Sequence, residues 1–422
     1  MRHGGAPFRE VFSSQGPLFL PLVWIGDVVG FRTANAPRVL SVGAGVAVAL
    51  LVWTIACRLA GPAAGLVAAL IVAVSGSVLW TTGPLAADGI GLALALGAVA
   101  VALAHRQEST FARAVAMGAL IGASFAIKSL FAVPPAVVVA WVLLERRQWG
   151  RLAAAVGASA ALVLAVAVPW GLADVWDQAV DYHLDAAGER TPGRNAAKIF
   201  TTAWDRDLLP LAALAAGLSA AGWARIRRRD AAIEWRAIGP VVAWLGAIVA
   251  VLVLEHPLWR PHLTHLVPPV VLVGTYAARR HLRVVVPVLA LVFVAHVASN
   301  TDILWPDKYD TTETAALHDL RELPDDGLVV TDEPGFPWRA GRRTPDDLVD
   351  ASVLRIESGR MTRGSVAAAA GGARVCAVLV WSHRFGDLDL AESLSPHGYV
   401  ETKRYGPVRT LFTRPCSTTA LP

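Results

Sequence analysis

Long apolar runs separated by short polar loops make up the first 300 residues of the chain. About 20 apolar residues cross the roughly 30 Å hydrocarbon layer of a bilayer, and most of these runs reach that length. The stretch 111–144 is too long for one span, and Pro134 and Pro135 interrupt it, so we expect two helices there. The pattern predicts ten spans, at about 37–57, 62–82, 88–104, 111–131, 132–144, 151–170, 207–223, 237–254, 263–278 and 282–298.

The composition excludes the soluble classes of protein. Hydrophobic residues make up 55% of the chain, charged residues only 17%, and the mean hydropathy is +0.50. Soluble globular chains carry about 25% charged residues. We therefore expect an all-α polytopic membrane bundle rather than a soluble enzyme, a disordered protein or a coiled coil.

The distribution of Lys and Arg predicts the orientation of the bundle. Cytoplasmic loops collect these cations, and alternate loops here hold almost all of them. The loops predicted to be inside carry Arg58, Arg106, Arg113, Arg146, Arg147, Arg151, Arg225, Arg227, Arg228, Arg229, Arg236, Arg279, Arg280 and Arg283. The loops 83–87, 173–206 and 255–262 and the tail 300–422 are then outside. The basic excess reflects this topology, so we expect a lipid bilayer and no nucleic acid as partner.

The same alternation places residues 1–36 outside, although no span precedes them. The run 17–31 is short for a span and contains Asp27, so it resembles an interfacial helix. Either the chain lacks its first span, or its true start lies upstream of Met1. The alternative is that 17–31 crosses the membrane and the topology changes.

The tail differs in character from the rest of the chain. Residues 300–422 alternate β-rich runs (328–331, 375–382 and 408–413) with helical stretches (311–323 and 345–358), which predicts a small extracytoplasmic α/β domain. The chain thus divides into an outer loop with an interfacial helix (1–36), a transmembrane module (37–299) and this domain. Cys376 and Cys416 are either a disulfide or two free thiols.

Few ionisable residues lie near the predicted spans, and each is costly in lipid. Asp88 is either a helix cap or a carboxylate that binds a cation or acts as a base. Glu10 is either a solvated loop acid or the partner of Asp88 on the outer side. Lys128 either reaches the interface by snorkelling or offers its ammonium to an anionic head group.

Two outer loops contain further candidates. The stretch EHPLWRPHLTH clusters Arg260, His262 and His265 on the outer side, a combination that suits phosphate and has too few ligands for a metal site. In the long 173–206 loop, Tyr182, His183 and Arg190 are either surface residues or contacts to a substrate.

Four motifs, in this order, resemble those of the polyprenol-phosphate-dependent membrane glycosyltransferases of the GT-C fold. The nearest group is glycosyltransferase family 39, which includes protein mannosyltransferases and lipid A aminoarabinose transferases. GGAPFREVFSSQGPLF resembles the first outer loop, and TTGPLAAD resembles the loop that ends in a carboxylate, here Asp88. GASFAIKSLFAVPP resembles the span with a Lys before Pro, and HPLWRPHLTHLVPP resembles the late outer loop.

The resemblance implies an enzyme of the cell membrane, with its C-terminal domain outside. It would transfer a hexosyl or pentosyl group, with inversion, from a polyprenyl phosphate to a hydroxyl of an envelope glycan, lipid or protein. Glu10 would be the base, although Asp is usual there, and Asp88 would organise the site. Lys128, Arg260, His262 and His265 would hold the donor phosphate, and Tyr182, His183 and Arg190 would contact the acceptor. The resemblance makes no cofactor certain, because metal use varies across such enzymes, and it leaves a divalent cation open.

Two other functions fit a polytopic membrane protein. A transporter or flippase for a lipid-linked sugar would need polar residues at mid-span and helices broken near the bilayer midplane. The spans are mostly Ala, Val, Leu and Gly, which disfavours transport. A non-catalytic assembly protein would work through its tail.

Overall fold

A computed structural model describes residues 5–33, 35–185, 188, 191–227, 234–304 and 311–416 of the chain. The chain forms two compact units. The bundle unit comprises Gln15–Pro169 and Gly188–Pro306, and the C-terminal unit comprises Met1–Ser14, Trp170–Ala187 and Asp307–Pro422.

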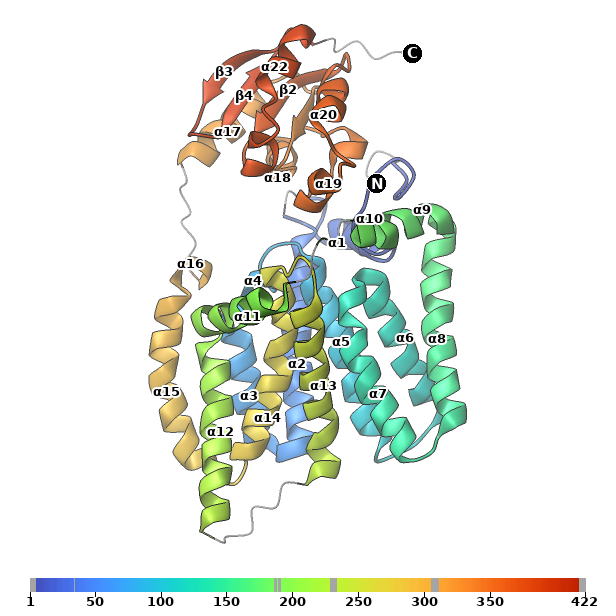
Figure 1. Ribbon diagram of the computed structural model, residues 1–422, viewed down its shortest axis with the longest axis vertical. Helices are drawn as coiled ribbons and strands as arrows, with labels where there is room; N and C mark the ends of the chain where they lie inside the picture. The colour runs from blue at the N-terminus through green and yellow to red at the C-terminus, as the bar shows by residue number, and fades with distance from the viewer. Residues whose placement is uncertain are drawn as a thin grey trace. The chain divides into compact units, whose positions relative to one another are not determined.

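Each of the ten predicted spans has a helical counterpart in the bundle unit (Figure 1). These are α2 (Arg38–Ala60), α3 (Pro62–Val74) with α4 (Gly76–Thr82), α5 (Ala87–His105), α6 (Phe111–Ile127), α7 (Val133–Glu145), α8 (Trp149–Ala167), α12 (Leu208–Ile226), α13 (Trp235–Leu254), α14 (Val267–Ala278) and α15 (Leu282–Ser299).

By length and composition, the described residues contain six helices that could cross a membrane, or seven if the bent pair α3 and α4 is one span. This is fewer than the ten predicted, because α6, α7 and α14 have only 17, 13 and 12 residues. The fold class is confirmed as that of a helical polytopic membrane protein with a small C-terminal sheet.

Close helix packing in the bundle depends on small residues. A Cβ atom at Gly118 of α6 would lie 1.9 Å from the carbonyl oxygen of Ala155 in α8. At Gly217 of α12, a Cβ atom would lie 2.1 Å from the carbonyl oxygen of Gly274 in α14. Helices in lipid gain little from hydrophobic burial, so contacts of this kind supply much of their packing energy.

Three interrupted helices meet at one end of the bundle. The pair α3 and α4 bends by 62°. The helix α6 gives way to the 3-10 turn η1 (Ser129–Phe131) before α7, and α14 is preceded by the 3-10 segment η4 (Arg260–Leu266). The helices α4, α5 and α11 (Pro192–Arg206) all contact η4, and η1 contacts α5. We call this region, with the start of α5, the broken-helix end (Figure 1).

The predicted split of 111–144 is confirmed, but it occurs earlier than expected. The helix α6 ends at Ile127, and Lys128 has an extended backbone with φ −160° and ψ 113°. Pro134 and Pro135 lie in the first turn of α7, where their missing N–H groups cost nothing. Lys128 is therefore at a helix break, not inside a span.

The N-terminal helix α1 (Phe19–Val29) has 11 residues and is therefore roughly 16 Å long. That length is about half of the hydrocarbon layer, which favours the interfacial interpretation over a crossing helix. The helix α11 is amphipathic. Its exposed Phe200 and Trp204 rings stack with centroids 6.3 Å apart.

The tail forms the predicted α/β domain around one four-stranded sheet of order β1-β2-β4-β3. The strands are β1 (Leu328–Thr331), β2 (Val375–Val380), β3 (Val400–Arg404) and β4 (Thr410–Thr413), of which only β1 and β2 are parallel. The helices are α17 (Thr311–Arg321), α18 (Gly335–Ala340), α19 (Val353–Glu357), α20 (Arg363–Ala370), α21 (His383–Gly386) and α22 (Ala391–Leu394). The predicted helix over 345–358 is only a 3-10 turn (Asp346–Leu348) and α19, with a non-helical stretch between them.

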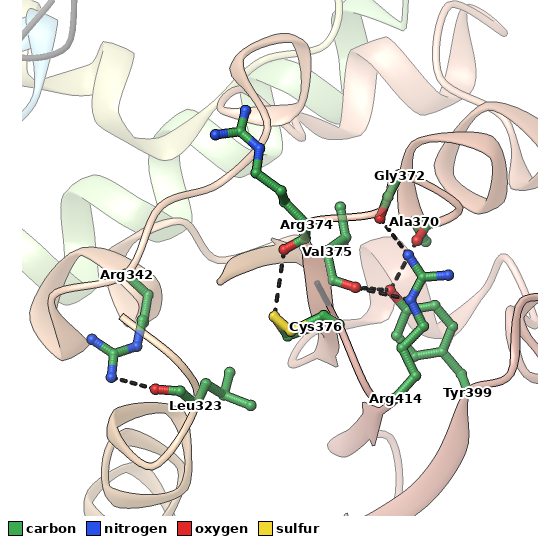
Figure 2. Close-up of a disulfide and its surroundings, with 10 residues drawn as sticks. Leu323, Arg342, Ala370, Gly372, Arg374, Val375, Cys376, Tyr399 and Arg414 are labelled. Carbon is green, nitrogen blue, oxygen red and sulfur yellow. Dashed lines mark hydrogen bonds between the residues drawn. A yellow bond between two sulfur atoms is a disulfide. The ribbon is translucent and has the colours of Figure 1, made fainter. Parts of the chain in front are cut away.

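Cys376 and Cys416 form a disulfide, which decides between the two alternatives left open by the sequence. The bond ties the last described residue of the chain to β2. Figure 2 shows the Arg414 side chain beside it, donating to the carbonyl oxygens of Val375, at 2.9 Å, and Gly372. The carboxyl end of the domain is therefore fixed covalently and by hydrogen bonds.

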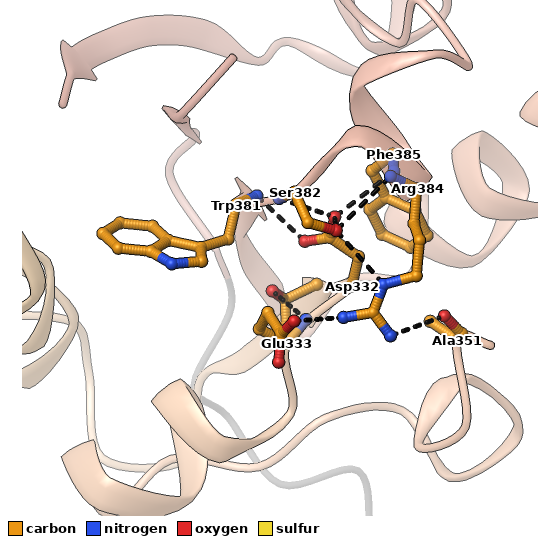
Figure 3. A network of polar contacts seen from close by, with 8 residues as sticks. Asp332, Glu333, Ala351, Trp381, Ser382, Arg384 and Phe385 are labelled. Carbon is orange, nitrogen blue, oxygen red and sulfur yellow. Dashed lines mark hydrogen bonds and ion pairs between the residues drawn. The ribbon is translucent and has the colours of Figure 1, made fainter. Parts of the chain in front are cut away.

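A polar network joins the carboxyl ends of the two parallel strands (Figure 3). Asp332, directly after β1, accepts hydrogen bonds from the backbone N–H groups of Trp381 and Ser382, each at 2.9 Å. Arg384 donates to Glu333 and to the carbonyl oxygen of Ala351. Asp332 is fully buried and both of its oxygens accept hydrogen bonds from these donors. The network therefore holds the carboxyl ends of β1 and β2 together.

Candidate active site

Asp88 and Lys128 form an ion pair at the broken-helix end. Asp88 is the second residue of α5, after the N-cap Ala86, so it is not the cap itself. Its Oδ1 atom lies 2.8 Å from Lys128 Nζ, and the Asp88 side chain is 8% exposed. The N-terminal turn of a helix favours a carboxylate, and the extended backbone at Lys128 brings the ammonium toward it.

His262 and Glu255 extend this pair into a row of four ionisable side chains, which we call the Asp88 row. His262 Nε2 lies 3.9 Å from Asp88 Oδ1, and His262 Nδ1 lies 2.5 Å from Glu255 Oε1. Glu255 was not singled out from the sequence, although it begins the motif that contains His262. Within the described residues, no group of three or more His, Cys, Asp or Glu side chains has the arrangement of a metal site.

His265 faces the core of the bundle. Its ring is fully buried, stacked on Phe131 at 4.7 Å between centroids and edge-on to Trp244 at 6.1 Å. Neither ring nitrogen has a hydrogen-bond partner among the described residues. These contacts are those of a packing residue, and its role as a phosphate ligand stays a prediction.

Arg260 lines a cavity of about 370 Å³ on another side of η4. Residues two apart on a 3-10 helix differ in direction by about 120°, which separates Arg260 from His262. Arg260 is exposed, and no described residue forms an ion pair or hydrogen bond with its side chain. The rest of the lining comes from Thr202, Trp204, Asp205, Arg206, Leu208 and Ser299.

Lys198 and Arg194, both in α11, lie near Arg260. Lys198 Nζ donates to the carbonyl oxygen of Leu258 at 2.5 Å. Partial burial lowers the pKa of Lys198, and the positive charges of Arg260 and Arg194 lower it further. By contrast, the other arginine of the cavity, Arg206, is held by both oxygens of Asp302 at 2.7 and 2.9 Å. Among the described lining residues, Arg260 is therefore the cation that forms no ion pair, although the carboxylate of Asp205 also lines the cavity.

A second buried carboxylate was missed from the sequence. Asp207 is 4% exposed and accepts hydrogen bonds from the hydroxyls of Ser75 and Ser77, each at 2.5 Å. Both serines lie at the bend between α3 and α4. The available signal was an acid at the start of the predicted span 207–223 and a Ser-Gly-Ser inside the span 62–82.

Three of the predicted site residues lie in the C-terminal unit. Glu10 is exposed, and its Oε2 atom accepts a hydrogen bond from the backbone N–H of Ala6 at 2.7 Å. Tyr182 is buried, and its hydroxyl lies 2.6 Å from Ser352 Oγ. His183 Nε2 lies 2.9 Å from the carbonyl oxygen of Ser14. Arg190 lies outside the described residues, and the functional roles of all four stay predictions.

No protein-family model matches the chain, and no curated protein matches it in sequence. In structure, it is similar to ArnT from Cupriavidus metallidurans in the apo state, with a TM-score of 0.64 and 13% identity over 95% of this chain and 88% of that one. The same enzyme bound to undecaprenyl phosphate gives a TM-score of 0.63, at the same identity and coverage.

An archaeal enzyme has a related structure. The oligosaccharyltransferase of Archaeoglobus fulgidus, tethered to an acceptor peptide with an NVT sequon, gives a TM-score of 0.53 and 13% identity. That match covers 96% of this chain and 66% of the other. At such identity the likeness establishes the fold alone. The chain therefore has the GT-C fold of the polyprenyl-phosphate-dependent membrane glycosyltransferases, as its four motifs predict.

Proposed function

We propose that this protein transfers a sugar, with inversion, from a polyprenyl-phosphate donor to a hydroxyl group of an envelope glycan, lipid or protein. The observation that carries the proposal is Arg260, an exposed cation that forms no ion pair with any described residue and lines a cavity at the broken-helix end. The shared fold supports it, because one protein of that fold was solved with undecaprenyl phosphate bound.

The chemistry makes few demands on the protein. The acceptor oxygen attacks the anomeric carbon, and the bond from that carbon to the phosphate oxygen breaks. The phosphate leaves with the bonding electrons, and the hydroxyl proton passes to a carboxylate base, for which Glu10 is the candidate. Arg260, with Lys198 nearby, would stabilise the charge that develops on the phosphate. Asp88 would hold Lys128 and His262 in place.

We propose that the broken-helix end and the C-terminal unit face the outside of the cell. The arginines of the predicted inner loops and the Cys376–Cys416 disulfide support this orientation, because disulfides persist in oxidising compartments. A membrane-impermeant protease added to intact spheroplasts should release fragments of residues 311–416. Cleavage only after lysis would contradict the orientation.

The function is tested with the full-length protein in membrane vesicles and radiolabelled polyprenyl-phosphate sugars. Arg260→Ala should raise the KM for the donor at least tenfold, because it removes the unpaired cation. Arg227→Ala is the matched control, since Arg227 lies at the far end of α12 and stacks on Trp223 at 4.4 Å. Its KM should stay within twofold of the wild type.

Three results would count against the proposal. Absence of transfer by the wild-type protein with every donor would reject the enzymatic function. Movement of donor across the vesicle membrane without transfer would favour the transporter instead. An unchanged KM in Arg260→Ala would reject the role of Arg260 while leaving the function standing.

A further inference from the structure

Two short segments from outside the C-terminal domain belong to the same compact unit as that domain. The first is 5–14, which carries Glu10. The second is 170–185, which contains the helices α9 (Leu172–Trp176) and α10 (Tyr182–Asp185) and a π-helical turn between them. Hydrogen bonds, ion pairs and ring contacts from one stretch, 350–360, join both segments to the domain.

Asp350 and Arg355 hold the first segment. The backbone N–H and the hydroxyl of Ser14 both donate to Asp350 Oδ2, at 3.1 and 2.5 Å. The guanidinium of Arg355 lies 4.1 Å from the centre of the Phe12 ring. Arg355 is only 9% exposed, so this cation–π contact is largely shielded from water.

Arg360 and Ser352 hold the second segment. Arg360 bridges two carboxylates, at 3.0 Å from Asp177 Oδ1 and 2.8 Å from Asp185 Oδ2. Ser352 Oγ lies 2.6 Å from the hydroxyl of Tyr182, and burial raises the pKa of that tyrosine to about 12. Because the Tyr182 hydroxyl is buried and hydrogen-bonded to Ser352, it serves as a structural contact between the second segment and the domain.

The two segments are also joined to each other. The side chain of Gln178 accepts from Ser13 N at 3.0 Å and donates to the carbonyl oxygen of Phe8 at 2.6 Å. The Phe12 ring meets the Tyr182 ring edge-on at 5.4 Å. Three parts of the chain, distant in sequence, therefore share one set of contacts.

The local structure of the domain explains how one short stretch makes these ties. The predicted helix over 345–358 is interrupted at 349–352, and the interruption leaves Asp350 and Ser352 outside any helix. Arg355 stabilises the interruption by donating to the carbonyl oxygens of Asp347 and Asp350. A continuous helix would have satisfied those carbonyls internally.

We propose that Asp350 and Arg360 are positioning residues for the sugar transfer: through Ser14, Asp177 and Asp185 they fix the segment that carries Glu10. This inference rests on the proposed function. Ordering a residue costs backbone conformational entropy, so a segment without regular secondary structure needs such ties to keep one conformation. A base displaced by about 1 Å can lose a hundredfold in rate.

The test uses Asp350→Ala and Arg360→Ala in the full-length protein in membranes, with Arg363→Ala as the matched control. Arg363 belongs to the same domain and pairs with Glu392 at 2.8 Å, away from both segments. We expect kcat to fall at least tenfold in the two test variants, with the donor KM within twofold of the wild type, and no change in the control. Amide hydrogen exchange in peptide 5–14 should accelerate at least tenfold, and Arg360→Lys should recover part of kcat.

Three outcomes would overturn the inference. The first is faster exchange in 5–14 with an unchanged kcat, and the second is unchanged exchange. The third is an equal loss of kcat in Arg363→Ala, which would indicate general damage to the domain. If the wild-type protein transfers no sugar, the proposed function fails, and hydrogen exchange alone then decides whether the ties fix the segment.

Discussion

Asp88 and Asp207 are both buried carboxylates at the broken-helix end, but their partners differ in kind. Their exposures are 5% and 4%. Asp88 is paired with the ammonium of Lys128 and approached by His262. Asp207 is held by the hydroxyls of two serines at the bend between α3 and α4.

The difference separates a chemical role from an architectural one. Lys128 has a long side chain that can shift toward an arriving anion, so the Asp88 pair can rearrange around a ligand. The serines of Asp207 are short and fixed by the backbone. A Cβ at Gly76, between them, would lie 2.2 Å from Asn300 Oδ1 and 2.5 Å from the carbonyl oxygen of Arg206, so the bend is closely packed and leaves no room for a side chain there. Asp207 thus secures α4, which meets η4 through the hydroxyls of Thr81 and Thr264, 3.2 Å apart.

The largest effect should follow from Asp88→Asn. The substitution removes the charge that holds Lys128 and His262, so we expect kcat for sugar transfer to fall about a hundredfold or more. Initial rates in membrane vesicles measure this. Asp207→Asn is the matched control, because its amide can still accept from one serine and donate to the other, and its kcat should fall less than threefold. Equal losses of kcat in the two variants would show that Asp88 and Asp207 do not differ in role.

The next effect is on stability and should follow from Asp207→Ala. Three hydrogen bonds to a buried carboxyl group are lost, from the hydroxyls of Ser75 and Ser77 and the backbone N–H of Ser77, and we expect this to cost about 3 kcal/mol. Thermal unfolding in detergent micelles, compared with Asp207→Asn, measures the loss. A cost of about 1 kcal/mol is expected for the Asn variant. If Asp88→Ala destabilises the protein as much as Asp207→Ala, the two carboxylates do not differ as proposed.

Sequence reasoning found Asp88 and missed Asp207 for a physical reason. Asp88 lies in a polar motif between two apolar runs, where a charge is conspicuous. Asp207 ends a loop rich in charged residues, so its burial depends on the bend at Ser75–Ser77, which no local pattern announces. Similarly, the motif around Arg260 and His262 was evident, but only the geometry of η4 shows that they face different sides.

The fold was more accessible to prediction than the ties between distant segments. The lengths of the apolar runs predicted ten segments that are all helical, of which six or seven among the described residues are long and apolar enough to cross a membrane. Strand β3 was missed, since all five of its residues are exposed and it shows no apolar alternation. The joining of 5–14 and 170–185 to stretch 350–360 depends on long-range contacts such as Ser14 with Asp350, which leave no trace in local sequence.

A smaller loss of stability should follow from Lys128→Met. The variant leaves Asp88 buried with His262 Nε2, 3.9 Å away, in place of the ammonium at 2.8 Å, which should cost about 2 kcal/mol because Lys128 itself is partly exposed. The double variant Asp88→Asn with Lys128→Met leaves neither charge and should recover at least half of that loss. A double-mutant cycle from thermal unfolding gives the coupling. Strictly additive effects would show that the pair does not interact.

The smallest effect should follow from Glu255→Gln, which acts on the Asp88 row from its far side. Glu255 Oε1 lies 2.5 Å from His262 Nδ1, so the neutral amide would orient the ring less firmly, and we expect kcat to fall about three- to fivefold, or roughly 1 kcal/mol. Glu145→Gln is the matched control, because Glu145 pairs with Arg106 at the far end of α7. Its kcat should equal that of the wild type. An equal loss of kcat in both variants would show that Glu255→Gln acts by lowering the stability of the protein. The residues proposed to take part in sugar transfer would then be Asp88, Lys128 and Arg260.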